Sequence, residues 1–293
     1  MKASKSLYSE AFKEYILSDS NVARLQETLY EMLEKICFVL NKYNIDYMLS
    51  GGTLLGAVRH NGFIPWDDDI DIMMTRENYV KLIEHQKELD DDLVLVEPLS
   101  SPKYYCKNPK VFKKNTQYVE ISNASMDTYD MVFIDIFIIE NAPKSKIRRK
   151  IRGFIYDISY KGASVCMDYM YPSTPIIKKA KKNNVLKKYY DMRRRLGFIF
   201  SIVGGLHFYL KTVDRLGNYK KQTGLYCVPS AISYNREVFP TAVFEEITVG
   251  KFEKANYKIP IHYDVYLKNL YGDYMQIPPV EKREVHIAYK LKL

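Results

Sequence analysis

Residues 47–74, YMLSGGTLLGAVRHNGFIPWDDDIDIMM, decide how the rest of the chain is interpreted. A short apolar run ends in the turn 50–53 (Ser-Gly-Gly-Thr). A polar, glycine-containing loop then leads to an acidic cluster and a second apolar run. This order predicts a strand, a turn, a helix, a loop and a second strand within 28 residues.

The glycines of this stretch suit an anion. Gly51 and Gly52 let backbone N–H groups approach a phosphate closely, because no Cβ atom stands in the way. If Thr53 opens a helix, the positive end of that helix points at the same anion. The turn therefore predicts a phosphate cradle.

The acidic cluster suits a divalent cation. Strand alternation places Asp69 and Asp71 on one face, with Asp67 in the same alternation and Asp68 on the other side. Two carboxylates at this spacing are a compact ligand pair for Mg²⁺, which binds one or two carboxylates together with substrate phosphates. The competing interpretation is a solvated acidic turn. The preceding Gly-Gly turn favours the metal site. A phosphate-binding turn beside a pair of metal-binding carboxylates is typical of enzymes that transfer phosphoryl or nucleotidyl groups.

A third carboxylate lies in the most apolar segment. Residues 131–139 (Met-Val-Phe-Ile-Asp-Ile-Phe-Ile-Ile) predict a central strand buried on both faces, with Asp135 in its middle. A buried carboxylate must be paired, protonated or metal-bound. A structural ion pair is the alternative to a site carboxylate that faces Asp69 and Asp71 as metal ligand or general base.

Composition describes a globular chain with one unusual region. The 293 residues allow one large or two modest domains, and the formal net charge is +9. Residues 141–195 hold 16 Lys and Arg against three acids, so this segment carries +13 and the remainder −4. The basic balance is regional and predicts an anionic partner, such as a membrane surface or a polyanionic glycan. No nucleic acid is expected, because no RNA- or DNA-binding motif accompanies it.

The four cysteines argue against a zinc site. Cys37, Cys106, Cys166 and Cys227 are scattered, with no C-x-x-C pair and no Cys/His cluster. With no signal peptide in the sequence, free thiols and a cytoplasmic location are expected. A peripheral position on the inner face of the plasma membrane stays open.

Hydrophobic periodicity outlines the other elements. Helices are expected at about 20–43, capped by Ser20 or Asn21, and at 76–89, capped by Thr75 with Val80 on its buried side. The remaining expectations are a strand at 93–96, paired strands at 111–112 and 117–121, helices through 144–195 with a break near 171–175, and a short helix at 264–270.

Residues 196–210 are apolar and follow three arginines. Fifteen residues are few for a membrane span. A core helix is the first interpretation, and a membrane-interface helix beside anionic lipid is the second.

The quoted stretch closely resembles the LicD family. The resemblance rests on Gly-Gly-Thr-Leu-Leu-Gly-Ala-Val-Arg-His at 51–60 and Ile-Pro-Trp-Asp-Asp-Asp-Ile-Asp-Ile at 64–72. It continues at 111–120, at Ile-Asp-Ile-Phe 134–137, and at 270–279 with Glu281, Arg283 and His286. The middle, about 141–225, is similar only in being basic and helical.

The resemblance implies an α+β fold with a nucleotidyltransferase-like mixed sheet flanked by helices. It divides the chain into a catalytic core at 1–140, a basic helical region at 141–225 and a segment completing the active site at 226–293. It also implies Mg²⁺ or Mn²⁺ and a CDP-activated donor, CDP-choline first. The acceptor would be a hydroxyl of an anionic or lipid-linked glycan precursor of teichoic acid, capsule or lipopolysaccharide.

Site roles follow from the same resemblance. Gly51, Gly52 and Thr53 would hold donor phosphate. Asp69 and Asp71 would bind metal, joined by Asp67 and Asp135. The further candidates for contacting the donor are Arg59, His60, Trp66, Lys110 and Lys113. For Arg59 and His60 the alternative is the protein surface, for Trp66 it is packing, and for the lysines it is a solvated hairpin.

Two other functions stay open on the sequence alone. One is nucleotidyl transfer from an NTP to a small molecule, protein or RNA. The other is a non-catalytic basic scaffold on a membrane, which intact Asp69, Asp71 and Asp135 disfavour.

Overall fold

A seven-stranded mixed sheet forms the centre of the protein in the computed structural model, which describes residues 2–101, 105–126, 129–283 and 287–293. Five of its strands run in the order β1-β2-β6-β4-β3, and β7 and β8 extend it from the far end of β6. Among the described strands, only β2 and β6 pair in parallel. The strands of this sheet are β1 (Met48–Leu49), β2 (Asp71–Thr75), β3 (Leu93–Val96), β4 (Lys110–Lys113), β6 (Phe133–Asn141), β7 (Leu225–Cys227) and β8 (Val238–Pro240).

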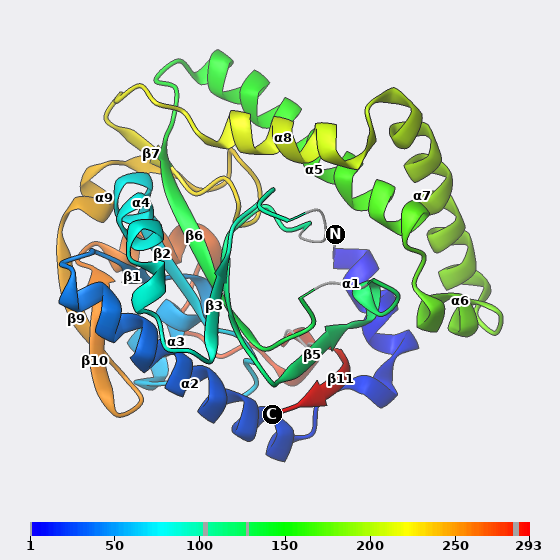
Figure 1. The fold of residues 1–293 in the computed structure, drawn as a ribbon, viewed down its shortest axis with the longest axis horizontal. Helices are drawn as coiled ribbons and strands as arrows, with labels where there is room; N and C mark the ends of the chain where they lie inside the picture. The colour runs from blue at the N-terminus through cyan, green and yellow to red at the C-terminus, as the bar shows by residue number, and fades with distance from the viewer. Residues whose placement is uncertain (1, 102–104, 127–128, 284–286) are drawn as a thin grey trace.

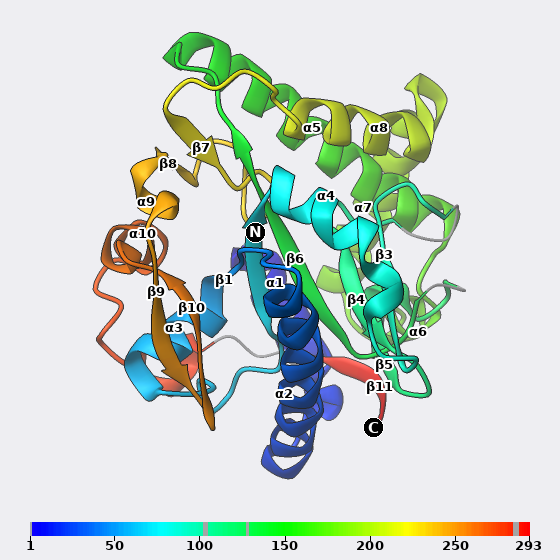
Figure 2. The ribbon, with the colours of Figure 1, turned by 60° about the vertical axis from the view of Figure 1, so that its left-hand side comes forward.

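Two small antiparallel pairs and ten α-helices surround this sheet (Figures 1 and 2). The pairs join β5 (Gln117–Glu120) to β11 (Ala288–Lys292), and β9 (Ile247–Phe252) to β10 (Ala255–Pro260). The helices are α1 (Lys2–Ala11), α2 (Asp19–Lys42), α3 (Gly51–His60), α4 (Arg76–Glu84), α5 (Lys146–Met170), α6 (Thr174–Ala180), α7 (Asn184–Val203), α8 (Gly205–Gly217), α9 (Ala242–Glu245) and α10 (Tyr263–Tyr271). The α+β architecture with a mixed sheet and flanking helices is confirmed.

The main core lies between the sheet and α2, α3 and α10. The apolar stripe of α2 is buried along its whole length, and Ile72, Ile134 and Ile136 of the central strands are completely buried against it. The 3.6-residue period of the stripe and the apolar run of β6 predicted both elements. Helices α5 to α8 form a separate layer along the upper and right-hand edges in Figures 1 and 2, here named the basic helical layer.

Helix starts differ from the sequence prediction in two places. Ser18, not Ser20 or Asn21, caps α2, and its hydroxyl accepts the N–H of Asn21. Ser50, not Thr53, is the cap residue of α3. Thr75 caps α4 as predicted, with its hydroxyl accepting the N–H of Asn78. Helix periodicity locates a helix within a few residues, whereas the cap is decided by the chain before it.

The strand pairing predicted between 111–112 and 117–121 is wrong. β4 lies between β3 and β6, and β5 pairs with β11. The Thr116 hydroxyl bonds the carbonyl of Lys113 and accepts the N–H of Val132, which turns the chain out of the main sheet. Val80, expected to be buried, is 45% exposed.

The single core helix expected at 196–210 is also wrong. The chain breaks at Gly204, and α7 and α8 meet there at a bend of 79°. Ile202 and Val203 at this corner are 71% and 73% exposed. Among the described helices, no single one has the length and apolar composition of a membrane span, although α7 and α8 taken together meet that test.

Candidate active site

The turn before α3 forms one wall of the site. The N–H of Ser50 bonds the carbonyl of Asp71, which fixes the start of α3 beside the start of β2. Gly51 has a φ of +50°, in the left-handed region that favours glycine. The first bond within the helix joins the N–H of Leu54 to the carbonyl of Ser50. The amides of Gly52 and Thr53 therefore have no partner within the helix and lie at its positive end.

Carboxylates stand directly over this turn. A Cβ atom on Gly51 would lie 2.9 Å from Oδ2 of Asp71, and one on Gly52 would lie 2.7 Å from Oδ2 of Asp67. Both separations are too short for a real carbon atom. The glycines thus provide space for Asp67 and Asp71 as well as backbone freedom. We call Asp67, Asp69 and Asp71 the acidic cluster.

The neighbouring segments hold the acidic cluster in place. The side chain of Gln26 on α2 donates to the carbonyls of Ile64 and Asp67, at 3.3 and 2.8 Å. The Thr53 hydroxyl accepts the N–H of Asp71 at 2.9 Å, and the side chain of Thr53 is buried. Thr53 therefore positions Asp71 through its side chain, and its backbone N–H lies at the positive end of α3.

Asp135 lies beside Asp71, as the parallel pairing of β2 and β6 requires. The two residues are direct register partners, and Lys110 on β4 is the register partner of Asp135 on its other side. Oδ2 of Asp135 accepts from Nζ of Lys110 at 3.1 Å, and Oδ1 accepts from the amide of Asn108. Three adjacent strands thus bring Asp71, Asp135 and Lys110 into one row.

Electrostatics show how closely the carboxylates lie. Burial raises the pKa of Asp71 well above its usual value, and the negative charges of Asp69, Asp135 and Asp67 raise it further. Burial alone would lower the pKa of Lys110, but the charge of Asp135 outweighs it and the pKa rises. The row therefore holds an ion pair next to a group of like charges.

The donor chemistry of the acidic cluster fits a hard cation. In the part of the chain that the structure describes, no three His, Cys, Asp or Glu side chains already stand in the arrangement of a metal site. Mg²⁺ needs fewer protein ligands, since one or two carboxylates and substrate phosphates suffice. Asp71 and Asp67 each direct an oxygen over the glycine turn, where those phosphates would lie.

Three predicted residues lie elsewhere. Arg59 and His60 form the last turn of α3, a helix of ten residues and so about 15 Å long. The Arg59 guanidinium donates to the carbonyls of Tyr274 and Gln276 at 2.7 and 3.3 Å. Lys113 bonds Asp92 at 2.8 Å, because a three-residue step along β4 turns it away from the face of Lys110.

Trp66 packs rather than presenting a free ring. The Arg283 guanidinium lies 4.0 Å from its ring centroid, and the edge of His60 lies 6.4 Å from it. The ring also contacts the main core. His286, which belongs to the same C-terminal signature as Arg283, lies outside the described residues.

Sequence reasoning missed a buried polar chain behind the glycine turn. The Ser50 hydroxyl lies 3.1 Å from the Tyr266 hydroxyl, and Tyr266 donates to Glu237 at 3.3 Å. Burial raises the pKa of Glu237 to about 7, while the hydrogen bond from Tyr266 opposes the rise. These residues are 216 positions apart in sequence, so no local pattern could have joined them.

Asn108 and Lys107 were missed as well. Lys107 stacks on Tyr160 at 4.2 Å, and burial lowers its pKa to about 8. Tyr271 is 45% exposed overall, but its hydroxyl points to Gly51. Burial of that hydroxyl and the charges of Asp71 and Asp67 raise its pKa. The one available signal was Lys107, a lysine before an Asn-Pro pair, three residues upstream of Lys110.

Gly51→Ala should reduce turnover at least tenfold, because the new methyl group collides with the Asp71 carboxylate. Gly205→Ala is the matched control, since Gly205 also has a positive φ, +73°, but its Cβ would meet nothing within 4 Å. Both variants should lose about 1 kcal/mol of unfolding free energy for the backbone strain. Chemical denaturation measures the backbone strain, and a turnover assay measures the effect of the collision with Asp71. Equal loss of turnover in Gly51→Ala and Gly205→Ala would contradict the collision as the cause.

Comparison with known proteins agrees with this geometry. Residues 44–176 match the sequence profile described as LicD/FKTN/FKRP, nucleotidyltransferase domain, which includes the glycine turn, the acidic cluster and Asp135. The lipopolysaccharide cholinephosphotransferase LicD of Haemophilus influenzae is 27% identical over 260 residues, covering 84% of this chain and 88% of that protein. The human ribitol 5-phosphate transferase FKRP is 46% identical over 44 residues, which are 15% of this chain and 9% of that protein. Residues 44–176 therefore resemble the nucleotidyltransferase domain of the LicD/FKTN/FKRP family, and most of the chain is similar to a cholinephosphotransferase.

Proposed function

We propose that this enzyme transfers an alcohol phosphate, phosphocholine or a close analogue, from a CDP-activated donor to a hydroxyl of a cell-surface glycan precursor. The observation that carries the proposal is the row of Asp71, Asp135 and Lys110 beside the Gly51-Gly52 turn. The names of these two relatives specify different alcohol phosphates, so the similarity alone leaves the alcohol open.

In the proposed reaction, the acceptor oxygen forms a bond to the phosphorus that carries the alcohol, and the bond to the CMP oxygen breaks. The acceptor proton passes to Oδ of Asp135, and CMP leaves. Asp69 and Asp71, joined by Asp67, would hold Mg²⁺ or Mn²⁺, which supplies charge neutralisation for the donor phosphates. The amides of Gly52 and Thr53 bind a phosphate oxygen at the positive end of α3.

Lys110 and Asn108 complete the proposed mechanism by orienting Asp135. Each donates to a different oxygen of its carboxylate, so the side chain cannot rotate freely. Tyr271 covers the acidic cluster from the α10 side and limits the entry of water. These residues position the reacting groups, which is where most of the catalysis in phosphoryl transfer arises.

A panel of donors tests the proposal directly. CDP-choline, CDP-ribitol, CDP-glycerol and CTP are each incubated with the protein, Mg²⁺ and a glycan precursor acceptor. Release of CMP from one of the CDP donors supports the proposal and identifies the donor. Release of pyrophosphate from CTP in place of CMP release would establish nucleotidyl transfer instead.

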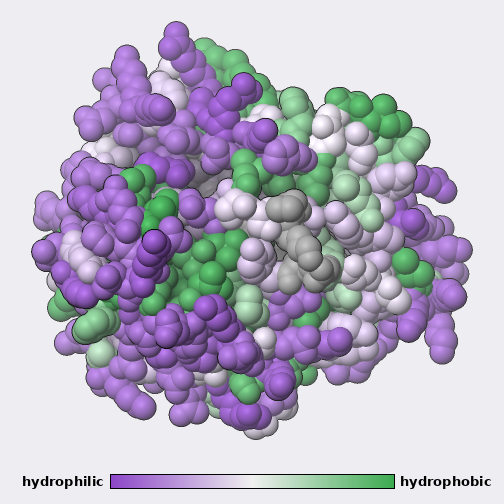
Figure 3. Space-filling model, viewed as in Figure 1, coloured by the Kyte–Doolittle hydropathy of each residue, from purple (hydrophilic) through white to green (hydrophobic). Residues whose placement is uncertain are grey.

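We further propose that the basic helical layer rests on an anionic membrane surface, where a lipid-linked acceptor would be presented. Its exposed apolar side chains recur at helical spacing along α5, at 147, 151, 154, 155 and 158, and along α7, at 185, 192, 196, 199 and 203. Figure 3 shows hydrophobic surface over the α7–α8 corner. Exposed lysines at 146, 150 and 211 flank these stripes. An apolar face flanked by basic side chains is complementary to anionic lipid.

Replacing Ile202 and Val203 by Ser should lower binding to anionic vesicles about thirtyfold, because the two side chains together lose roughly 2 kcal/mol of burial. The control is Val249→Ser, which removes an equally exposed apolar side chain, 62%, from β9. Flotation with phosphatidylglycerol–phosphatidylcholine vesicles measures the change. If wild-type protein does not float with these vesicles, or if both variants bind equally, the membrane proposal is wrong.

A further inference from the structure

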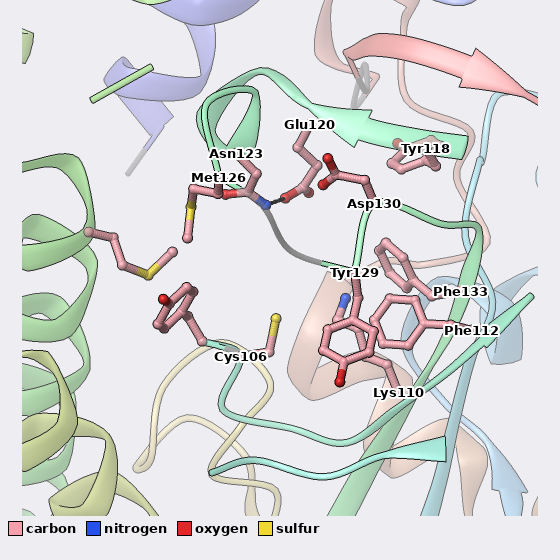
Figure 4. Close-up of a pocket in the computed structure, with 12 residues that line it drawn as sticks. Cys106, Lys110, Phe112, Tyr118, Glu120, Asn123, Met126, Tyr129, Asp130 and Phe133 are labelled. Carbon is pink, nitrogen blue, oxygen red and sulfur yellow. Dashed lines mark hydrogen bonds between the residues drawn. The ribbon is translucent and has the colours of Figure 1, made fainter. Parts of the chain in front are cut away.

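A second cavity adjoins the proposed reaction site, on the other side of Lys110. It lies between β4, β5 and the residues Tyr105, Cys106, Met126, Tyr129 and Asp130, and Figure 4 shows the side chains that line it. Its volume is about 60 Å³, which is room for several water molecules. The cavity therefore suits a small head group and is too small for a nucleotide.

Aromatic rings form most of one wall. Phe112 and Tyr129 stack with ring centroids 5.3 Å apart. Phe133 meets Phe112 edge-on at 5.8 Å and Tyr118 at 5.9 Å. These contacts fix the rings relative to one another before any ligand enters. Aromatic faces attract cations, and quaternary ammonium groups in particular.

The ammonium group of Lys110 already packs against this aromatic wall. Its Nζ lies 3.3 Å from the ring centroid of Phe133, so an ammonium group is accommodated against these aromatic side chains. The charge of Lys110 is matched by Asp135. The other charged residues that line the cavity are Glu120 and Asp130. Together with Lys110 they give the lining a formal charge of −1, and Asp135, which pairs with Lys110 from outside the lining, is not included in this sum. Figure 4 shows the carboxylates of Glu120 and Asp130 beside each other, with the Asn123 side chain donating to Glu120.

Two contacts connect the cavity to the proposed reaction site. Lys110 lines the cavity and bonds Asp135. The Tyr118 hydroxyl, from the aromatic wall, donates to Asp68 at 2.9 Å, and Asp68 lies between Asp67 and Asp69 of the acidic cluster in the sequence. A ligand with its head in the cavity would therefore have its next atoms beside Lys110 and Asp135, where the transferred phosphate is proposed to lie.

We propose that this cavity binds the trimethylammonium group of the alcohol, and that Tyr129 and Asp130 determine the specificity for it. The transferred alcohol is then choline, not ribitol or glycerol, whose hydroxyl groups would lose their water against aromatic rings without hydrogen-bond partners in return. The inference rests on the proposed function for the position of the phosphate. The chemistry of the cavity argues for the cation independently.

Tyr129→Leu should raise the KM for CDP-choline about tenfold and leave kcat within about twofold, because the cation–π contact is worth roughly two- to thirtyfold in affinity. Tyr129→Phe keeps the ring and should change the KM by less than about twofold. Asp130→Asn removes charge without removing volume and should raise the KM several-fold. CMP release from CDP-choline, CDP-ethanolamine and CDP-ribitol provides the kinetic readout, and the KM for CDP-ethanolamine should change less.

Binding of tetramethylammonium to the full chain, followed by saturation-transfer NMR, tests the cavity without turnover. Wild type and Tyr129→Phe should show saturation that Tyr129→Leu lacks, and circular dichroism checks that each variant is folded. Equal saturation in all three, or none in wild type, overturns the inference. If CDP-ribitol or CDP-glycerol is used better than CDP-choline, the proposed function stands and the choline site is wrong. If no CDP donor releases CMP, the proposed function fails, and NMR alone decides on the cavity.

Discussion

Asp71→Asn should lower the turnover of the donor at least a hundredfold, because a bound metal ion supplies several kcal/mol of charge stabilisation in the transition state. The substitution keeps the size of the side chain and removes its charge. Asp71 is the one carboxylate that both faces the glycine turn and lies in register with Asp135.

The fold of the Asp71→Asn protein should be intact. The pKa of Asp71 is raised, so its ionised form is less favourable in the folded protein than in the unfolded chain. Neutral Asn relieves this cost, and the free energy of unfolding without metal should equal or exceed that of wild type. A variant that unfolds would show instead that Asp71 has a structural role.

Metal binding gives a second measurement on the same variant. Mg²⁺ should raise the Tm of wild type and leave the Tm of Asp71→Asn unchanged, since only a folded protein with an intact site gains stability from the ion. Asp91→Asn is the matched control, because Asp91 is an exposed carboxylate in the 90–92 run. It should retain both turnover and the Tm shift. An equal Tm shift in all three proteins would contradict the assignment of metal to the acidic cluster.

The sequence predicted the parts of this site that local periodicity encodes. Alternation separated Asp71 from Asp68, and the structure places Asp68 in a buried hydrogen bond to Tyr118. The continuous apolar run around Asp135 predicted a central strand, and β6 lies between β2 and β4. Strand pairing then brings Asp71 and Asp135 together across 64 residues of sequence, because parallel neighbours share one register.

The sequence pattern could not predict contacts between residues that are far apart in the chain. Lys110 was a candidate for donor phosphate, but its nearest negative charge is Asp135 of the next strand. The Ser50–Tyr266–Glu237 chain depends on how α10 packs behind α3. The apolar run 196–210 was interpreted as core because hydropathy cannot show what covers a surface. Only the bend at Gly204 and the exposure of Ile202 reveal that the described chain leaves this corner open.

A double-mutant cycle on Lys110 and Asp135 separates structure from catalysis at the centre of the site. Their side chains are 12% and 14% exposed, so removing either partner leaves a largely buried charge. Asp135→Asn and Lys110→Met should each lower the free energy of unfolding by about 3 kcal/mol. The double variant has neither charge, and its stability should return to within about 1 kcal/mol of wild type. Urea denaturation of the four proteins measures the coupling.

Turnover in the same four proteins should not follow stability. If Asp135 accepts the acceptor's proton, Asp135→Asn loses at least a hundredfold in kcat, and adding Lys110→Met restores the fold but not the rate. Had Asp135 served only to neutralise Lys110, the double variant would recover turnover together with stability. Lys110→Met alone should be intermediate, because Asp135 keeps its bond to Asn108 but loses the contact that orients its second oxygen. Recovery of kcat in the double variant would therefore show that Asp135 is not the proton acceptor. The proposed mechanism would then depend on the carboxylates of the acidic cluster alone.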